Sequence, residues 1–166
     1  KPTLVVFLRH AGCTFCKQAL TDLSARKPEL ESNGIQLALV HLSTPESMDA
    51  TLTKYSLTGT PHISDPDRRL YRSFDLHRGS WSQLFGLTVW LRGAQAPLAG
   101  HGVGKLEGDG FQMPGAFLVR NGEILRAHRH DTAADRPDYT ALACIPNASD
   151  NPRAAPPPGR STPTPV

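Results

Sequence analysis

The chain opens with two runs of apolar residues that flank one amphipathic segment. The first run, Thr3–Arg9, is rich in β-branched and aromatic residues with little alternation, which predicts a strand covered on both faces. The second run, Ile35–Leu42, has the same character. Between them lie four residues at the spacing of one helical face: Cys16, Ala19, Leu20 and Leu23. Strand, helix and strand in this order predict a parallel strand pair with a right-handed crossover.

Several residues mark where the helices should begin and end. Pro28 should kink or interrupt the first helix, and Asn33-Gly34 is a stop of the kind found at helix C-termini. Thr44 followed by Pro45 predicts the start of a second helix. We expect its buried face to contain three residues: Met48, Leu52 and Tyr55.

The later part of the chain should add one long helix, a hairpin and a short helix. A third short strand is expected at Pro61–Ser64, and the long helix should begin near Ser80. Glycines dominate residues 93–110, which we expect to form a loop. In AFLVRNGEIL, Asn121-Gly122 joins two β-rich runs, and this dipeptide is preferred in two-residue hairpin turns. A closing helix is expected within Pro137–Ile145.

Parallel strands with crossover helices, followed by a hairpin and a helix, predict an α/β fold of the thioredoxin-like type. This fold has a mixed central sheet flanked by helices. The chain of 166 residues is long enough for one domain with its own core, which we expect to span residues 1–145. Residues 146–166 contain seven of the fifteen prolines and almost no large apolar residues, which predicts a disordered tail.

The composition favours a protein of a reducing compartment. Three cysteines are too few for a disulfide framework, which indicates thiols kept reduced or kept for their reactivity. The net charge of +3 is modest, and arginines such as Arg68 are interleaved with Asp67 and Asp75, which predicts a solvated face and no nucleic-acid partner. No apolar run approaches the ~20 residues that span a bilayer. We therefore expect a cytoplasmic protein that does not bind a membrane.

Two of the cysteines, Cys13 and Cys16, are separated by two residues where the first strand gives way to the helix. Side chains three apart in a helix have Cβ atoms ~5–6 Å apart, whereas a disulfide needs about 3.8 Å, so Cys13 should lie at the helix start. There the helix dipole and unpaired N–H groups favour its thiolate. Cys16 should be more buried and less acidic. The pair predicts that Cys13 attacks a disulfide or a peroxide and that Cys16 resolves the product.

Two other interpretations of the cysteine pair stay open, namely half of a metal site and a pair of inert buried thiols. A zinc site needs two further ligands, for which His128 and His130 are candidates. Residues i and i+2 of a strand share a face, so we favour an exposed strand edge for this HRH segment and expect no metal ion. GHGVGKLEG lacks the glycine and hydroxyl positions of a phosphate loop, so no nucleotide cofactor is expected.

Three segments carry a resemblance to a known family: VVFLRHAGCTFCKQAL, HISDPDRRLYRSF and GDGFQMPGAFLVRNGEI. In this order they resemble the peroxiredoxin-like branch of the alkyl hydroperoxide reductase and thiol-specific antioxidant (AhpC/TSA) superfamily, within the thioredoxin fold. The resemblance implies that Cys13 is the reactive cysteine and Cys16 its resolving partner. It also implies a cis Met113-Pro114 bond beside the dithiol, which would leave the Met113 backbone free to pair with an extended substrate.

The sequence departs from true peroxiredoxins, which carry a Pro-x-x-x-Thr/Ser-x-x-Cys motif whose hydroxyl helps bind the peroxide. Counted back from Cys13, Val6 occupies the proline position and His10 the hydroxyl position. The arginine that such enzymes place before the hairpin strand is missing from GFQMPGAF. Peroxide reduction needs donors on both oxygens as their bond breaks, so these losses should weaken it. Dithiol exchange needs neither group.

His10 and Cys144 each have two interpretations. His10 either hydrogen-bonds the Cys13 thiolate and moves protons during exchange, or ends a strand with its ring half packed against the helix. Cys144 is expected at an apolar position of the last helix and is otherwise a third redox thiol.

The sequence thus predicts a thiol-disulfide oxidoreductase of the peroxiredoxin-like family that uses the dithiol. Its expected partners are a disulfide or peroxide substrate and a cellular reductant, either a thioredoxin-like protein or glutathione. We expect Met113, Pro114 and His10 to position the substrate. Two alternatives are a thiol-dependent hydroperoxidase that uses the same cysteines and a non-catalytic metal-binding or interaction module.

Overall fold

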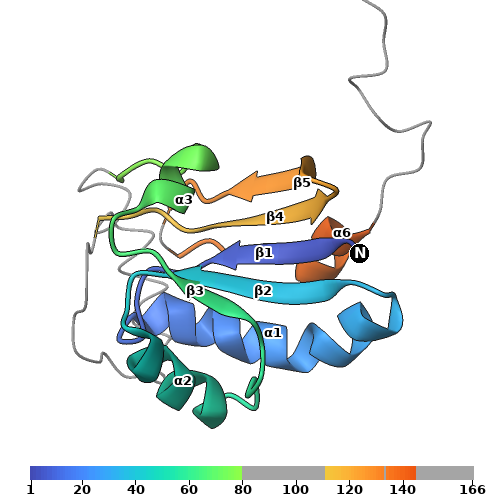
Figure 1. Ribbon diagram of the computed structural model, residues 1–166, viewed down its shortest axis with the longest axis horizontal. Coiled ribbons are helices and arrows are strands. Elements are labelled where there is room, and N and C mark those ends of the chain that lie inside the picture. The colour runs from blue at the N-terminus through green and yellow to red at the C-terminus, as the bar shows by residue number, and fades with distance from the viewer. Residues whose placement is uncertain (80–110, 133, 145–166) are drawn as a thin grey trace, which may run out of the picture.

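The computed structural model of the protein describes residues 1–79, 111–132 and 134–144. Three sequence predictions lie outside these ranges: the helix beginning near Ser80, the loop at residues 93–110 and the disordered tail at residues 146–166. Within the described ranges the chain forms five strands and four helices (Figure 1). None of these helices combines the length and the apolar character that crossing a bilayer would require.

A mixed five-stranded sheet forms the centre of the described fold. Its strands are β1 (Thr3–Phe7), β2 (Gln36–His41), β3 (His62–Ser64), β4 (Gly115–Arg120) and β5 (Glu123–Arg129). Their order across the sheet is β3-β2-β1-β4-β5. β1 and β3 run parallel to β2, whereas β4 runs antiparallel to both β1 and β5. The predicted parallel pair, the third strand and the mixed α/β sheet are confirmed.

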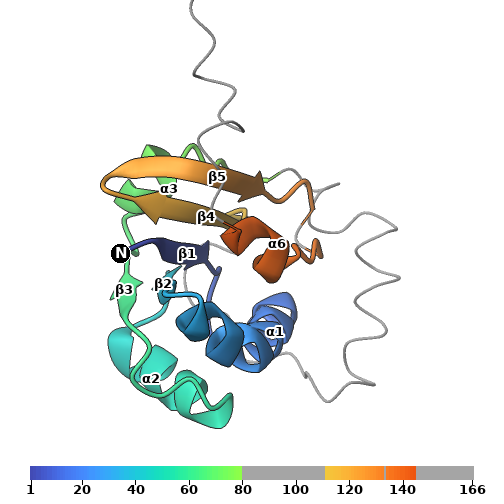
Figure 2. The same cartoon turned by 90° about the vertical axis from the view of Figure 1, so that its right-hand side faces the viewer.

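Helices lie on both faces of this sheet. Three of them cover one face: α1 (Thr14–Ser32), α2 (Pro45–Lys54) and α6 (Tyr139–Ala143). The short helix α3 (Arg69–Ser73) lies on the opposite face (Figure 1, Figure 2). The cysteine pair lies where β1 leads into α1, so the arrangement of these two elements determines the geometry of the site.

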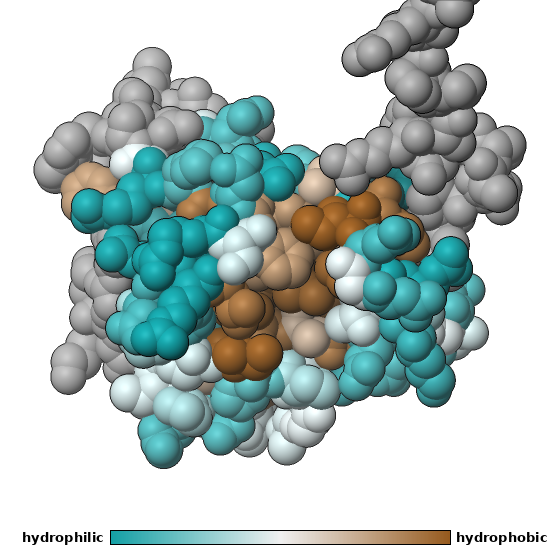
Figure 3. Space-filling view, turned by 45° about the horizontal axis from the view of Figure 1, so that its top comes forward, coloured by the Kyte–Doolittle hydropathy of each residue, from teal (hydrophilic) through white to brown (hydrophobic). Residues whose placement is uncertain are grey.

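Each face of the sheet has its own apolar core. On the α1 side, Leu4, Leu39 and Leu118 belong to one buried cluster with residues of the helices. On the α3 side, the Phe7 ring meets the rings of Tyr71 and Phe117 edge to face. Apolar side chains still gather at the surface on this side of the sheet (Figure 3). The α3 helix is short, and among the described residues it is the helix that packs there.

The first helix differs in one respect from its prediction. α1 continues through Pro28 to Ser32, so the expected interruption does not occur. Pro28 lies near the end of the helix, and buried Leu30 keeps the turn that follows it packed in the core. The predicted stop is confirmed, because Gly34 adopts φ +72° and the Ile35 N–H donates to the Leu30 carbonyl at 2.9 Å.

Two predicted turn signals are also confirmed. The Thr44 hydroxyl accepts a hydrogen bond from the Ser47 N–H at 3.3 Å and caps α2, which begins at Pro45. Asn121 and Gly122 join β4 to β5 with φ values of 53° and 81°. Positive φ at both central residues is the geometry for which this dipeptide is preferred in hairpins.

α3 is an element that the sequence pattern did not indicate. Its first backbone N–H groups donate to the carboxylate of Asp65, at 2.9 Å from Arg69 and 2.8 Å from Leu70. Tyr71 is fully buried, and its hydroxyl donates to the Leu8 carbonyl just beyond β1. Arg69 and Arg72 are exposed, as expected for a solvated face. The DPDR turn therefore also initiates a short helix that anchors the end of β1.

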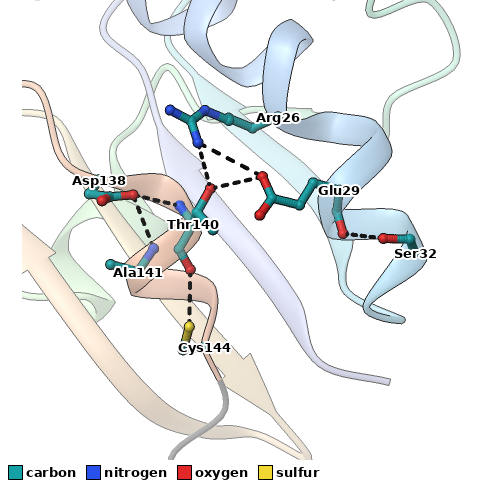
Figure 4. A network of polar contacts seen from close by, with 7 residues as sticks. All are labelled: Arg26, Glu29, Ser32, Asp138, Thr140, Ala141 and Cys144. Carbon is teal, nitrogen blue, oxygen red and sulfur yellow. Dashed lines mark hydrogen bonds and ion pairs between the residues drawn. The ribbon is translucent and has the colours of Figure 1, made fainter.

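The predicted closing helix is confirmed as α6, which packs against α1 (Figure 4). Asp138 caps it by accepting two backbone N–H groups at 3.0 Å. The Thr140 hydroxyl lies within hydrogen-bond distance of Arg26 and Glu29 on α1. Cys144 is exposed, and its thiol donates to the Thr140 carbonyl at 3.5 Å. The expectation of an apolar helix position for Cys144 is wrong, because the helix ends one residue earlier.

Candidate redox site

The loop between β1 and α1 places Cys13 at the start of the helix. Cys13 is the N-cap residue, with φ −74° and ψ 123°, and its carbonyl accepts the Lys17 N–H at 3.0 Å. The Cys16 N–H donates to Cys13 Sγ at 3.4 Å. A sulfur thus takes the capping role that Ser or Asp oxygens often have. The predicted position of Cys13 at the helix start is confirmed.

The surroundings of Cys13 stabilise its thiolate. A hydrogen bond from the Cys16 side chain has the largest effect, and the positive charge of Arg9 acts in the same direction. The backbone N–H groups of Cys16 and Phe15 contribute as well. Burial opposes them, because desolvation favours the neutral thiol. Together these effects lower the pKa of Cys13 to about 6, so this cysteine is mostly ionised at neutral pH.

Cys16 has the opposite protonation preference. Burial, together with the neighbouring Cys13 sulfur, raises the pKa of Cys16 well above its ordinary value. Cys16 is less acidic, as expected, but with 4% of its surface exposed it is only slightly more buried than Cys13 at 6%. Both are free thiols. The pair therefore holds a thiolate at the helix start and a protonated, buried thiol one turn further on.

Arg9 is a functional candidate that the sequence analysis did not single out. Its backbone N–H donates to Cys16 Sγ at 3.2 Å, while its charge favours the Cys13 thiolate. A cation four residues before the first cysteine was the available signal. The loop geometry that places Arg9 next to the sulfurs cannot be inferred from the sequence.

Contacts with the residues that follow β2 hold the loop that carries Cys13. The Leu42 N–H donates to the Arg9 carbonyl at 2.9 Å, and the Ala11 N–H donates to the Ser43 hydroxyl at 2.8 Å. His10 is buried, and its carbonyl accepts the Cys13 N–H at 3.0 Å. The contact of His10 with Cys13 thus involves the His10 backbone.

The Met113-Pro114 segment lies beside the cysteine pair, but not with the expected backbone. No peptide bond between described residues is cis, so the predicted cis bond is wrong. Nor is the Met113 backbone free: its N–H donates to the His77 carbonyl at 3.1 Å, and its carbonyl accepts the Gln112 side-chain amide at 3.2 Å. Residues 111–113 instead pair with residues 77–79, and the chain then continues into β4.

The same segment nevertheless reaches the site. Met113 packs against Phe15, which lies between the two cysteines. Pro114 and Cys16 line one small cavity. The structure therefore brings Met113 and Pro114 next to the dithiol, the location that the family resemblance implied.

His128 and His130 are not on an exposed strand edge. β5 is an edge strand, but both side chains are partly buried, and their ring centroids lie 5.2 Å apart. His128 pairs with Ala116, whose side chain is in the core on the α1 side, so the histidines face the helices. In the part of the chain that the structure describes, no three His, Cys, Asp or Glu residues are grouped so as to hold a metal ion.

The sheet order and the cysteine pair at the start of α1 are those of a thioredoxin-like protein. The family model for AhpC/TSA antioxidant enzymes matches residues 22–132. The chain belongs to this family. Since the match begins after Cys16, the assignment of the dithiol rests on the sequence and geometry of this chain.

Proteins named peroxiredoxin-like 2A are similar to most of the chain. The mouse protein is 26% identical over 135 residues, which cover 80% of this chain and 60% of the mouse protein. The Xenopus tropicalis protein is 26% identical over 141 residues, which cover 84% of this chain and 60% of that protein. The chain thus spans about 60% of the length of these curated relatives.

Solved structures share the fold. The bacterioferritin comigratory protein of Xanthomonas campestris has a TM-score of 0.59 at 19% identity. The match covers 86% of this chain and 75% of the Xanthomonas chain. A putative thiol:disulfide interchange protein DsbE from Chlorobium tepidum has a TM-score of 0.52 at 18% identity. The match covers 86% of this chain and 74% of the DsbE chain. These likenesses confirm the predicted thioredoxin-like architecture.

Proposed function

We propose that the protein is a thiol-disulfide oxidoreductase that uses Cys13 and Cys16. The ionised Cys13 at the start of α1, next to the protonated Cys16, is the observation that carries this proposal. The Cys13 thiolate attacks one sulfur of a substrate disulfide, forms a mixed disulfide and releases the first substrate thiolate. Cys16 then loses its proton and attacks Cys13 Sγ. The second substrate thiolate leaves, and two electrons have passed to the substrate.

A cellular reductant must then restore the dithiol. A thioredoxin-like protein or glutathione would supply two electrons and two protons to the Cys13–Cys16 disulfide, in the reducing environment of the cytoplasm. The membership of the chain in an antioxidant enzyme family supports such a thiol-based cycle.

Three further residues are proposed to position the substrate. The packing of Met113 on Phe15 and the cavity shared by Pro114 and Cys16 support this role for the segment before β4. His10 holds the Cys13 N–H through its carbonyl. A substrate that paired with the Met113 backbone would first have to replace the hydrogen bond that Met113 makes to His77.

A thiol-dependent hydroperoxidase is a second candidate function, favoured by the cationic Arg9 beside the Cys13 thiolate. In this reaction Cys13 attacks the outer peroxide oxygen and becomes a sulfenic acid, and the alcohol leaves. Cys16 then displaces water from the sulfenic acid and forms the same intramolecular disulfide. The absence of the hydroxyl residue at position 10 argues against high efficiency.

Single substitutions of the cysteines test the proposal with a disulfide-containing peptide as substrate. Cys16→Ser should accumulate a mixed disulfide with one peptide per protein, because the resolving thiol is gone. Cys13→Ser should form no mixed disulfide and lose turnover. Cys144→Ser is the matched control and should keep wild-type turnover, because this thiol is exposed and distant in sequence from the pair. Wild-type turnover in Cys13→Ser would rule the proposal out.

The competing functions give different results with the same protein. Rapid consumption of hydrogen peroxide at low concentration, with slow peptide reduction, would favour the hydroperoxidase. Stoichiometric zinc in protein purified under reducing conditions, with no reversible disulfide, would favour a non-catalytic metal-binding or interaction module.

A further inference from the structure

The proposed cycle requires Cys16 to lose a proton in surroundings that favour its protonated form. Cys16 is buried, and burial raises its pKa. The Cys13 thiolate is the base next to it in the resting protein, but this thiolate is consumed when the mixed disulfide forms. A second proton acceptor must therefore lie within reach of Cys16 during the resolving step.

A cavity of about 20 Å³ lies against Cys16. Besides apolar residues, five side chains with polar groups line it: Arg9, Cys16, His130, Asp135 and Tyr139. A water molecule requires ~10–15 Å³ and two to four polar partners. The cavity thus has the size and the polar lining for one water molecule, with the resolving thiol at its wall.

His130 presents an unused hydrogen-bond acceptor. Its backbone N–H donates to the Pro114 carbonyl at 3.3 Å, which fixes the residue after β5. One ring nitrogen donates to the Thr132 backbone carbonyl, and Nδ1 is buried without a hydrogen-bond partner among the described residues. The donor is therefore Nε2, and in the neutral ring Nδ1 carries a lone pair.

The groups around the ring keep it neutral at rest, and one of them favours its protonated form. Burial, assisted by the nearby His128, lowers the pKa of His130 to about 4. The Asp135 carboxylate acts in the opposite direction and is held in place by the Thr132 hydroxyl at 2.7 Å. Arg9 and Tyr139 also line the cavity. At pH 7 the ring is therefore neutral with its Nδ1 lone pair available, and Asp135 offsets part of the charge that an arriving proton would bring.

We propose that a water molecule in this cavity connects Cys16 to His130, and that His130 is a positioning residue for the resolving step. The inference rests on the proposed oxidoreductase function. The Cys16 proton passes to the water, and a proton of the water passes to Nδ1. The electron pair left on Cys16 Sγ forms the bond to Cys13 Sγ. The Cys13–substrate bond breaks, and the released substrate thiolate takes up a proton from the imidazolium.

His130→Asn tests the inference, because Asn retains an oxygen that can hold a water molecule but does not accept a proton at neutral pH. Reduced protein is mixed with excess disulfide peptide, quenched with acid at intervals and analysed by mass spectrometry. Formation of the mixed disulfide should keep its wild-type rate. Its decay at pH 7 should be about 100-fold slower, at the lower end of general-base effects, and should recover with rising pH as hydroxide replaces the ring.

His62→Asn is the matched control, because His62 lies on β3, at the opposite edge of the sheet from β5, and does not line the cavity. It should leave the decay rate unchanged. His130→Ala adds a second readout, since free imidazole should restore its decay rate but not affect the wild type. A purely structural role for His130 would show neither imidazole rescue nor the change in pH profile.

Decay of the His130→Asn mixed disulfide at the wild-type rate across the pH range would overturn the inference. Should the substitutions prevent folding, the wild-type protein provides the test, because its decay must slow in deuterated water if proton transfer is part of the step. A decay rate that is identical in both solvents would equally overturn the inference. A wild-type protein that forms no mixed disulfide would instead refute the proposed function, so the two failures are distinguishable.

Discussion

The backbone N–H of Arg9 donates a hydrogen bond to Cys16 Sγ at 3.2 Å, so the residue that follows β1 contacts the second thiol directly. The side-chain charge of the same residue favours ionisation of the first thiol. One residue thus acts on both sulfurs through two different groups. A substitution of the side chain leaves the backbone bond in place, so the two effects can be separated.

Replacement of Arg9 by glutamine should therefore raise the pKa of Cys13. Loss of an opposite charge a few ångströms away typically changes a pKa by about 1. The pH dependence of Cys13 alkylation by iodoacetamide measures the shift, and the rate at pH 6 should fall in the variant. Arg126→Gln is the control, because Arg126 is an exposed cation on β5. Equal alkylation profiles for the two variants would exclude a role for the Arg9 charge.

The Cys16 side chain should have an even larger effect on Cys13 than Arg9 has. Its hydrogen bond is the largest cause of the lowered pKa, and Cys16→Ala removes this bond while keeping the backbone N–H. The midpoint of Cys13 ionisation, followed by the ultraviolet absorbance of the thiolate, should move upward from about 6. Cys144→Ala should not move it. A midpoint that remained near 6 in Cys16→Ala would show that the backbone and Arg9 suffice.

Much of the fold could be predicted because local signals and long-range packing agree. The apolar runs at Thr3–Arg9 and Ile35–Leu42 contain the strands β1 and β2, and Asn121-Gly122 forms the hairpin turn. The position of Cys13 at the cap of α1 could be predicted from disulfide geometry, because two cysteines three residues apart inside a helix cannot form a disulfide. Each of these inferences depends only on residues that are close together in the sequence.

The unpredicted features depend on contacts between distant segments. α3 spans five residues, too few for a helical period to be apparent, and it is stabilised by Asp65 and by burial of Tyr71. The Met113-Pro114 bond is trans, and the residues before it pair with residues 77–79, which are far away in the sequence. The placement of His130 at the cavity follows from the pairing of β5 with β4, which the hydrogen bond from the His130 N–H to the Pro114 carbonyl extends by one residue. No local pattern reports such pairings.

Asp65→Ala should destabilise the protein by about 1–2 kcal/mol, the usual effect of losing an N-terminal helix cap. The buried Asp65 carboxylate accepts backbone N–H groups at the start of α3, and α3 places Tyr71 in the core under the sheet. Urea unfolding monitored by circular dichroism measures the change. The nearby, exposed Asp67 provides the control, since Asp67→Ala should alter the free energy of unfolding by less than about 0.5 kcal/mol. Equal effects of both substitutions would contradict the capping role of Asp65.

The stability of the reduced protein should depend on pH through Cys13. The folded pKa of about 6 lies below that of an unfolded cysteine, about 8.5, so the unfolded state binds more protons between these values. The stabilisation from Cys13 is therefore absent below pH 6, increases between pH 6 and about 8.5, and is complete above that range. Cys16, with its raised pKa, acts in the opposite direction, but only above about pH 8.5.

The window from pH 6 to 8 thus isolates the contribution of Cys13. In the presence of a non-thiol reductant, the free energy of unfolding of the wild type minus that of Cys13→Ser should increase with pH across this window. The oxidised wild type is an internal control, because a disulfide between Cys13 and Cys16 has no proton to bind. The pH dependence of its stability should match that of the double variant Cys13→Ser/Cys16→Ser, which cannot form this disulfide. A difference that stays constant from pH 6 to 8 would mean that Cys13 has an ordinary pKa in the folded protein, and the thiolate chemistry proposed for the site would lose its physical basis.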